Sequence, residues 1–124
     1  MKVIATKNAP AAVGPYSQAI DCGGTVYCSG QIPLDPQTGA VVEGGLEAQA
    51  HQMFRNVKAV LAEAGLGLEN VVKTTVFMTD LGQFGALNAI YAEYFAEPCP
   101  ARSCVEVSAL PKGVLVECEV IARR

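Results

Sequence analysis

Apolar residues recur at the spacing of an α-helix between Leu46 and Ala64. Seven of them fall on one stripe: Leu46, Ala50, Met53, Val57, Val60, Leu61 and Ala64. Gly65 follows directly, as is typical of the residue after a helix end. The pattern predicts an amphipathic helix that packs one face onto a core.

A second helical pattern runs from Phe84 to Phe95 and stops before Pro98. Asp80 and Gln83 stand three positions apart just before it, in the arrangement of a capping box with Asp in the place of Ser or Thr. The sequence therefore predicts a second helix over this stretch.

Short segments rich in β-favouring residues surround the two helices, at 2–6, 16–20, 25–30 and 70–79. Residues 21–24, Asp-Cys-Gly-Gly, separate the second from the third and have the composition of a turn. We expect these two segments to form a β-hairpin, with the other segments in the same sheet.

The last two predicted strands span 101–108 and 114–122 and alternate apolar with polar residues. We expect the apolar face of each strand to lie beneath the helices, because one face of a half-buried sheet must cover the core. That places four side chains together on the opposite, helix-free face: Arg102, Cys104, Glu117 and Glu119.

Two helices on one side of a mixed, mostly antiparallel sheet define an α+β sandwich. We expect one domain over residues 1–124, because no repeat or polar linker divides the chain. Hydrophobic residues make up 51% of the chain and the mean hydropathy is +0.28, which is high for a small monomer. We therefore expect another copy of the chain to cover the helix-free face.

The charge of the chain limits its possible binding partners, and its cysteine content indicates the cellular compartment. The net charge of -3 provides no cationic surface for nucleic acid or anionic lipid. Five cysteines, with no C-x-x-C pair, suggest reduced thiols in a cytoplasmic protein. No apolar segment has the length of a signal sequence or a membrane span.

His51 and Cys104 are of residue types that can bind metals or act as nucleophiles, and their sequence neighbours indicate whether they do so here. His51 is the only histidine, and one histidine does not make a metal site, so we expect a structural or solvated role and no metal. Cys104 lies two positions from Arg102, whose charge could lower the thiol pKa, but no histidine is near in sequence to act as its base. A small strand residue is the simpler interpretation of Cys104.

Arg102 and Glu117 allow two interpretations. They could form an ordinary structural ion pair, which does no chemistry. Alternatively, the planar guanidinium could bind a carboxylate through two parallel hydrogen bonds, while the nearby glutamate holds a water molecule. The second interpretation predicts a site for water attack on a small acid.

Five segments, taken in order, carry a likeness to a known family: GPYSQA (14–19), SGQIPLDPQTG (29–39), NVVKTTVFMTDL (70–81), LNAIYAEYF (87–95) and PARSCVEVSALPKGVLVE (100–117). In order and spacing they resemble the Rid/YjgF family of reactive intermediate deaminases. The likeness covers nearly the whole chain. One visible departure is Cys118, where the family more often has Ile or Met.

The resemblance implies a chorismate-mutase-like sandwich that forms a homotrimer with clefts between subunits. It also implies an enzyme, a 2-iminobutanoate/2-iminopropanoate deaminase. Such an enzyme hydrolyses 2-aminoacrylate, 2-aminocrotonate and their imine tautomers, which pyridoxal-phosphate-dependent dehydratases release, to 2-keto acids and ammonia. The family protein itself uses no cofactor.

Residue by residue, the resemblance implies that Arg102 binds the substrate carboxylate and Glu117 orients or activates the attacking water. Cys104 would contribute main-chain groups rather than its sulfur. Four more residues would surround the substrate: Tyr16 as a cleft wall, Ser29 and Gly30 as loop positions near the ligand, and Asn88 as a polar cleft residue.

Two other classes of function stay open at this point. A non-catalytic trimer that senses keto acids, or a chaperone-like trimer, would use the same carboxylate-binding arginine. An RNA-acting translation inhibitor or ribonuclease is a third possibility, which the acidic composition and the lack of a basic patch disfavour.

Overall fold

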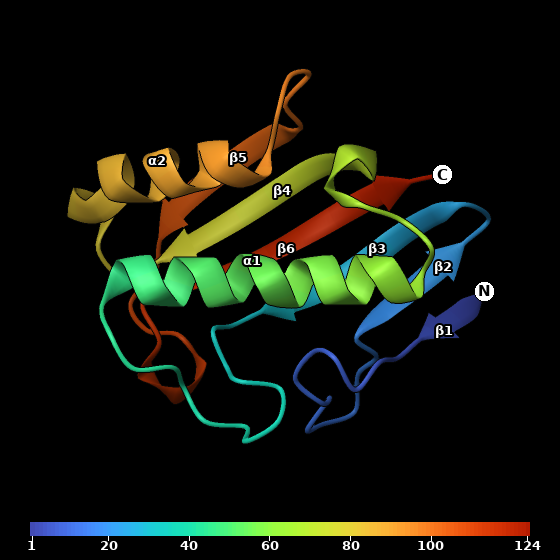
Figure 1. The fold of residues 1–124 in the computed structure, drawn as a ribbon, viewed down its shortest axis with the longest axis horizontal. Coiled ribbons are helices and arrows are strands. Elements are labelled where there is room, and N and C mark those ends of the chain that lie inside the picture. The colour runs from blue at the N-terminus through green and yellow to red at the C-terminus, as the bar shows by residue number, and fades with distance from the viewer.

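A computed structural model describes residues 1–124 as one six-stranded mixed sheet with two α-helices packed against it (Figure 1). The strands are β1 (Lys2–Ile4), β2 (Ala19–Cys22), β3 (Thr25–Gln31), β4 (Val71–Met78), β5 (Ala101–Glu106) and β6 (Val116–Arg123). Their order across the sheet is β1-β2-β3-β6-β4-β5. All neighbouring pairs are antiparallel except β4 and β5, which are parallel.

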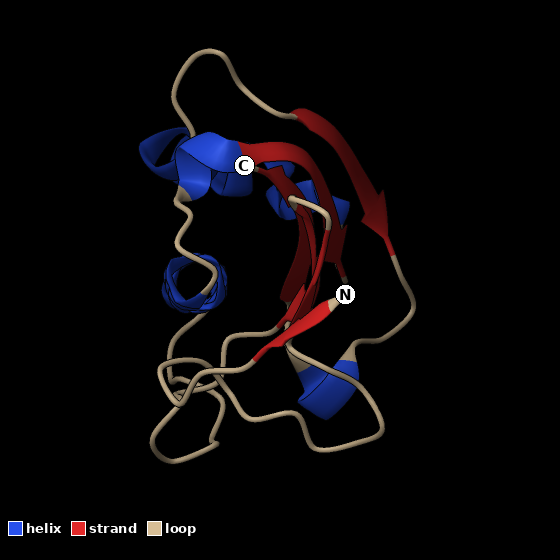
Figure 2. Cartoon of the chain, turned by 90° about the vertical axis from the view of Figure 1, so that its right-hand side faces the viewer, coloured by secondary structure: helices blue, strands red, loops and turns tan.

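Helices α1 (Leu46–Glu63) and α2 (Phe84–Tyr94) lie on the same face of the curved sheet (Figures 1 and 2). Three short 3₁₀ turns complete the structure, at Leu68–Asn70, Leu81–Gln83 and Pro111–Gly113. The predicted α+β arrangement, with two helices on one face, is confirmed. None of the helices is both long and apolar enough to cross a bilayer.

Both helices form where the apolar spacing predicts them. Met53 and Phe54 of α1 are completely buried, and Gly65, in the left-handed region at φ 74°, ends the helix. At α2 the Asp80 carboxylate accepts a hydrogen bond from the Gly82 N–H at 2.8 Å, so Asp80 caps the 3₁₀ turn that leads into the helix.

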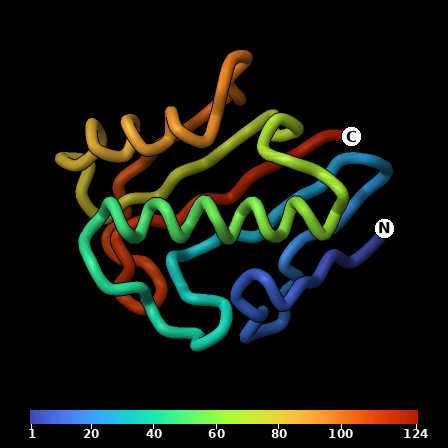
Figure 3. The backbone as a smooth tube through the Cα atoms, in the orientation of Figure 1, coloured from blue at the N-terminus to red at the C-terminus, as the bar shows by residue number.

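The hairpin of β2 and β3 is also as predicted. Gly23 and Gly24 form its two-residue turn with positive φ angles of 63° and 92°, the conformation that glycine tolerates best. The predicted strand at 16–20 is wrong in its first half, because β2 begins at Ala19 and Tyr16 belongs to the preceding loop. Figure 3 shows the blue N-terminal part of the chain looping before it enters the hairpin. The neighbouring strand β1 ends at the same level, since Ile4 is opposite Ala19.

Central strand β6 provides the middle of the core. Its alternate residues Val116, Cys118, Val120 and Ala122 are buried beneath the helices, as the alternation predicts. Cys118 is completely buried, and burial raises the pKa of its thiol, so it behaves as a small apolar side chain.

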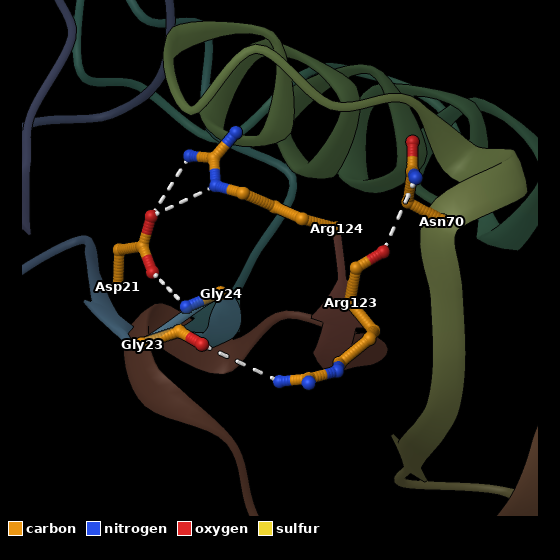
Figure 4. A network of polar contacts seen from close by, with 6 residues as sticks. All are labelled: Asp21, Gly23, Gly24, Asn70, Arg123 and Arg124. Atoms are coloured by element: carbon orange, nitrogen blue, oxygen red, sulfur yellow. Dashed lines mark hydrogen bonds and ion pairs between the residues drawn. The ribbon is translucent and has the colours of Figure 1, made fainter.

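The C-terminal end of β6 is fastened to the β2–β3 hairpin by polar contacts (Figure 4). The Arg124 guanidinium donates two hydrogen bonds to one Asp21 oxygen, at 2.8 and 3.1 Å, and the other oxygen accepts from the Gly24 N–H. The hydrogen-bonded Arg124 lowers the pKa of the Asp21 carboxyl. The Asn70 side chain donates to the Arg123 carbonyl, which ties the start of β4 to the same end.

Candidate active site

A cavity of about 640 Å³ opens at one end of the sheet. Three loops line it, with residues from 10–18, 32–39 and 111–112, together with the end of β3 and the outer face of β6. Four of the residues that sequence analysis assigns to the substrate site meet here: Tyr16, Ser29, Gly30 and Glu117. This cavity is large enough to hold a small metabolite.

The carboxylate of Glu117 lies directly against Gly30. Strand β3 carries one extra residue at this point, since Cys28 to Gln31 on β3 spans the same length as Val120 to Cys118 on β6. A Cβ atom at Gly30 would overlap the Glu117 carboxylate. Glycine is therefore needed here for close approach of the glutamate side chain.

The cavity makes Glu117 a weaker acid than a free glutamate. Burial raises the pKa of the Glu117 carboxyl, and the nearby Glu119 carboxylate raises it further. Glu119 lines the same cavity. A carboxylate with a raised pKa binds a proton more readily, so Glu117 is better suited to accept one from water.

Ser29 and Tyr16 have different positions around the cavity. The Ser29 hydroxyl donates to the Ser17 carbonyl at 2.6 Å, and its main-chain N–H donates to Gln18, so Ser29 joins β3 to the first loop. Tyr16 is 50% exposed and forms part of the cavity wall.

Arg102 lies on β5, outside this cavity, with its guanidinium held over α2. Its Nη1 donates to Oδ1 of Asn88 at 2.7 Å, and its Cζ lies 4.7 Å from the ring centre of Tyr91 and 5.3 Å from that of Phe84. No carboxylate of the chain pairs with it, since the one ion pair present joins Arg124 to Asp21. Arg102 and Asn88, which the resemblance assigns to the same substrate site, are thus in contact, but away from Glu117.

Cys104 follows Arg102 on the same side of β5 and is half-buried against the core. Burial raises the pKa of its thiol, and the charge of Arg102 offsets this only in part. A protonated thiol is a poor nucleophile. The position agrees with a small strand residue rather than a reactive cysteine.

The prediction that Arg102, Cys104, Glu117 and Glu119 share the helix-free face is wrong for the first two. Arg102 aligns with Thr74 of β4, which aligns with Val120 of β6, and both of these are buried under the helices. Glu117 instead aligns with Phe77, on the other face. One chain alone therefore holds Arg102 and Glu117 on opposite faces of its sheet, which also excludes a structural ion pair between them within the chain.

His51 is used structurally. Its Nδ1 and the Tyr94 hydroxyl are 2.7 Å apart, and the two rings pack together between α1 and α2. No group of three or more His, Cys, Asp or Glu side chains is arranged to hold a metal ion.

Several cavity residues escape prediction from the sequence. The sequence predicts Glu119 on the sheet surface but in no site, and Lys112 falls between the last two predicted strands. Lys112 has a positive φ of 57° and its Nζ donates to the Gly39 carbonyl, so it joins two cavity loops. Nothing in the local sequence pattern marks it, because the contact spans 73 positions along the chain.

A small α+β sandwich with an acidic cavity at the end of its sheet defines the class of protein. The sequence model of the Endoribonuclease L-PSP family matches residues 6–124. The chain therefore belongs to this family, which includes the Rid and YjgF proteins. The resemblance noted in the sequence is thereby confirmed.

The similarity to known proteins extends over nearly the whole of this chain and of each relative. A RutC family protein of Synechocystis sp. is 58% identical over 98% of this chain and 95% of its own. The 2-iminobutanoate/2-iminopropanoate deaminase of Salmonella typhimurium is 56% identical over 99% of this chain and 98% of its own. A solved structure of the Rid family protein YyfA from Yersinia pestis has a TM-score of 0.96 and 55% identity, and covers 99% of this chain and 98% of that one. The expectation of an imine deaminase agrees with the name of the Salmonella relative.

The contact between Gly30 and Glu117 can be tested by mutation. Gly30→Ala should destabilise the fold by about 1 kcal/mol, because the added methyl group must displace the flexible end of the Glu117 side chain. The free energy of unfolding in urea measures this. Combining Gly30→Ala with Glu117→Ala should restore most of the stability, since the double variant removes the overlap.

Gly85 offers a matched control, because a Cβ there meets nothing within 4 Å and the residue lies in α2. Gly85→Ala should leave the stability unchanged or raise it by up to about 1 kcal/mol. Equal stability losses in Gly30→Ala and in the double variant would contradict the close contact.

Proposed function

We propose that this protein hydrolyses the imine tautomers of 2-aminoacrylate and 2-aminocrotonate to 2-keto acids and ammonia, at a site made by two copies of the chain. One copy provides the cavity with Glu117, and the other provides Arg102. The observation that carries the proposal is that Asn88 and Tyr91 hold Arg102, Glu117 lies in the cavity, and neither charged group has an ionic partner.

Arg102 is suited to bind the carboxylate of a small acid. Its contacts with Asn88 and Tyr91 use one Nη1 hydrogen bond and one face of the guanidinium, and the remaining N–H groups stay available. A substrate carboxylate can accept two of them in parallel. Because the guanidinium is already oriented, little conformational entropy is lost when the substrate binds.

Glu117 is suited to hold the attacking water. The enamine first takes a proton at C3 and becomes the imine. The water oxygen then forms a bond to C2 while Glu117 accepts a proton, and the carbon–nitrogen π electrons move to nitrogen, which is protonated. Glu117 then returns its proton to the amino nitrogen, the carbon–nitrogen bond breaks, and the hydroxyl group loses its proton to solvent, which releases ammonia and leaves the 2-keto acid. Arg102 and Glu117 act by placing the reacting atoms together, and no covalent intermediate is required.

Assembly of identical copies would bring the two halves together. Arg102 and Glu117 occupy opposite faces of the sheet, and a head-to-tail contact between copies would bring one beside the other; such contacts form a ring when the rotation between copies closes. The helix-free face carries Val3, Tyr27 and Val105, which are 58%, 51% and 42% exposed and need cover. We propose the homotrimer that the family resemblance implies.

The cavity disfavours RNA as a substrate. Glu117 and Glu119 line it, with Lys112 as its one cation, and the whole chain has a net charge of -3. Two carboxylates would repel the phosphate groups of RNA. A keto-acid sensor would share the Arg102 site but would not depend on the water held by Glu117, so Glu117→Gln separates the sensor from the catalyst.

A trapping assay tests the activity directly. Threonine dehydratase acts on threonine in the presence of semicarbazide, which traps the imine that the dehydratase releases. Increasing amounts of this protein should lower semicarbazone formation while the yield of 2-keto acid is maintained, because hydrolysis precedes trapping. Unchanged trapping at all protein concentrations would overturn the proposed activity.

Mixed assemblies test whether the site is shared. Arg102→Ala and Glu117→Gln should each lower kcat/KM by roughly a hundredfold, since losing one partner of a charged contact costs about 2–5 kcal/mol. Unfolding the two variants together and refolding them as a mixture should restore part of the activity, because some interfaces then combine an intact Arg102 with an intact Glu117.

Arg55→Ala is the control for the loss of an arginine, because Arg55 is an exposed residue of α1 that does not line the cavity. Light scattering of each variant verifies that assembly is preserved. Activity in the mixture no greater than in the separate variants, with assembly intact, would place Arg102 and Glu117 in different sites.

The raised pKa of Glu117 sets the expected pH dependence. The carboxylate form accepts the proton, so kcat/KM should fall as the pH falls through the raised pKa. Glu119→Gln removes a neighbouring negative charge and should lower the pKa of Glu117, which moves the fall in kcat/KM to a lower pH. A pH–rate profile that is identical in the two proteins would contradict the assignment of Glu117 as the base.

A further inference from the structure

Three buried carboxamide side chains lie beneath the three loops of the cavity. Gln18, Gln49 and Asn56 are 5%, 7% and 1% exposed, and every one of them hydrogen-bonds to the main chain of a different loop. A buried amide without partners is costly, so these contacts must be kept in the folded protein.

Gln18 holds the loop between β1 and β2. Its Oε1 accepts from the Thr6 N–H at 2.6 Å, and its Nε2 donates to the carbonyls of Thr6 and Pro10 at 3.0 and 2.8 Å. One side chain therefore binds both ends of a five-residue segment. Pro10 itself lines the cavity.

Asn56 holds the loop after β3. Its Nδ2 donates to the carbonyls of Ile32 and Leu34, both at 3.0 Å, and its Oδ1 accepts from Gln52 at 2.9 Å. Because both loop partners are acceptors, only the amino end of the side chain can face them. Ile32 and Leu34 line the cavity.

Gln49 holds the loop before β6. Its Oε1 accepts from the Leu115 N–H at 2.8 Å, where the chain leaves the turn with Pro111 and Lys112 and enters β6. Gln49 and Asn56 are seven positions apart in α1 and therefore lie on the same side of the helix. Helix α1 thus fixes two of the three loops.

We infer that Gln18, Gln49 and Asn56 are positioning residues that set the shape of the cavity by fixing one loop each. The inference rests on the proposed function only in its kinetic test, because KM is measured with the imine substrate. Glu117 and Arg102 lie on strands rather than on these loops. Loss of one amide should therefore weaken substrate binding more than the chemical step.

Gln49 provides the sharpest test because two variants separate its hydrogen bond from its volume. Gln49→Met loses the acceptor for the Leu115 N–H, whereas Gln49→Glu keeps one. Hydrogen exchange at the Leu115 amide should be faster in Gln49→Met and close to that of the natural protein in Gln49→Glu. KM for the imine, generated in the trapping assay, should rise about tenfold in Gln49→Met, with kcat changed less than about threefold.

Two further variants and one control extend the test to the other loops. Gln18→Met should raise exchange at the Thr6 amide, and Asn56→Asp should raise exchange within 32–39, each without affecting the other loops. Val60→Ala is the matched control, because Val60 is fully buried in α1 but hydrogen-bonds to no loop. This variant should lose stability with KM and loop exchange unchanged.

The outcomes are distinguishable. Exchange that rises only in the loop of the mutated amide, with a raised KM, supports the inference. Exchange that rises evenly along the chain, or kinetic changes equal to those of Val60→Ala, would show a general loss of stability and overturn it. If the natural protein hydrolyses no imine, the proposed function fails instead, and the exchange measurements still decide whether the amides fix the loops.

Discussion

The parallel pairing of β5 with β4 determines where the charged groups of this protein can act. It aligns Arg102 with Thr74 and so turns the guanidinium toward α2, where Asn88 and Tyr91 hold it. The antiparallel pairing of β6 with β4 aligns Glu117 with Phe77 and turns the carboxylate to the other face. A shift of one residue in either register would exchange the faces, because successive side chains of a strand alternate.

The glutamate side of the site depends on irregular backbone rather than on regular strands. The extra residue of β3 places Gly30 beneath Glu117, and the absence of a side chain there lets the carboxylate lie within the cavity wall. The surrounding loops contain few buried apolar residues, and amide hydrogen bonds from Gln18, Gln49 and Asn56 supply the order that packing does not. Partial burial in this setting is also what raises the pKa of Glu117.

Local patterns predict the elements of this fold well and their relative arrangement less well. The apolar spacing from Leu46 and the glycine pair at 23 and 24 identify α1 and the hairpin, since both signals are contained in a few consecutive residues. Alternation also gives the correct two faces of β5 and of β6 taken separately. It cannot give the phase between them, because β4 separates the two strands. The apolar face of 101–108, which we expect beneath the helices, includes Val105, and this residue lies on the helix-free face at the sheet edge. The family resemblance assigns Tyr16, Ser29, Gly30 and Glu117 to one site, and in the structure these four residues line the same cavity.

The separation of Arg102 from Glu117 within one chain has a chemical advantage. If the two side chains met in the folded monomer, they would neutralise each other, and a substrate carboxylate would have to displace Glu117 from the guanidinium. On opposite faces, Arg102 is oriented by Asn88 and Tyr91, Glu117 faces the cavity, and both keep their hydrogen-bonding capacity. In the shared site that we propose, a small acid would lie between them, with its carboxylate on Arg102 and its C2 atom toward the water on Glu117. The substrate itself would then keep the cation and the anion apart while both act on it.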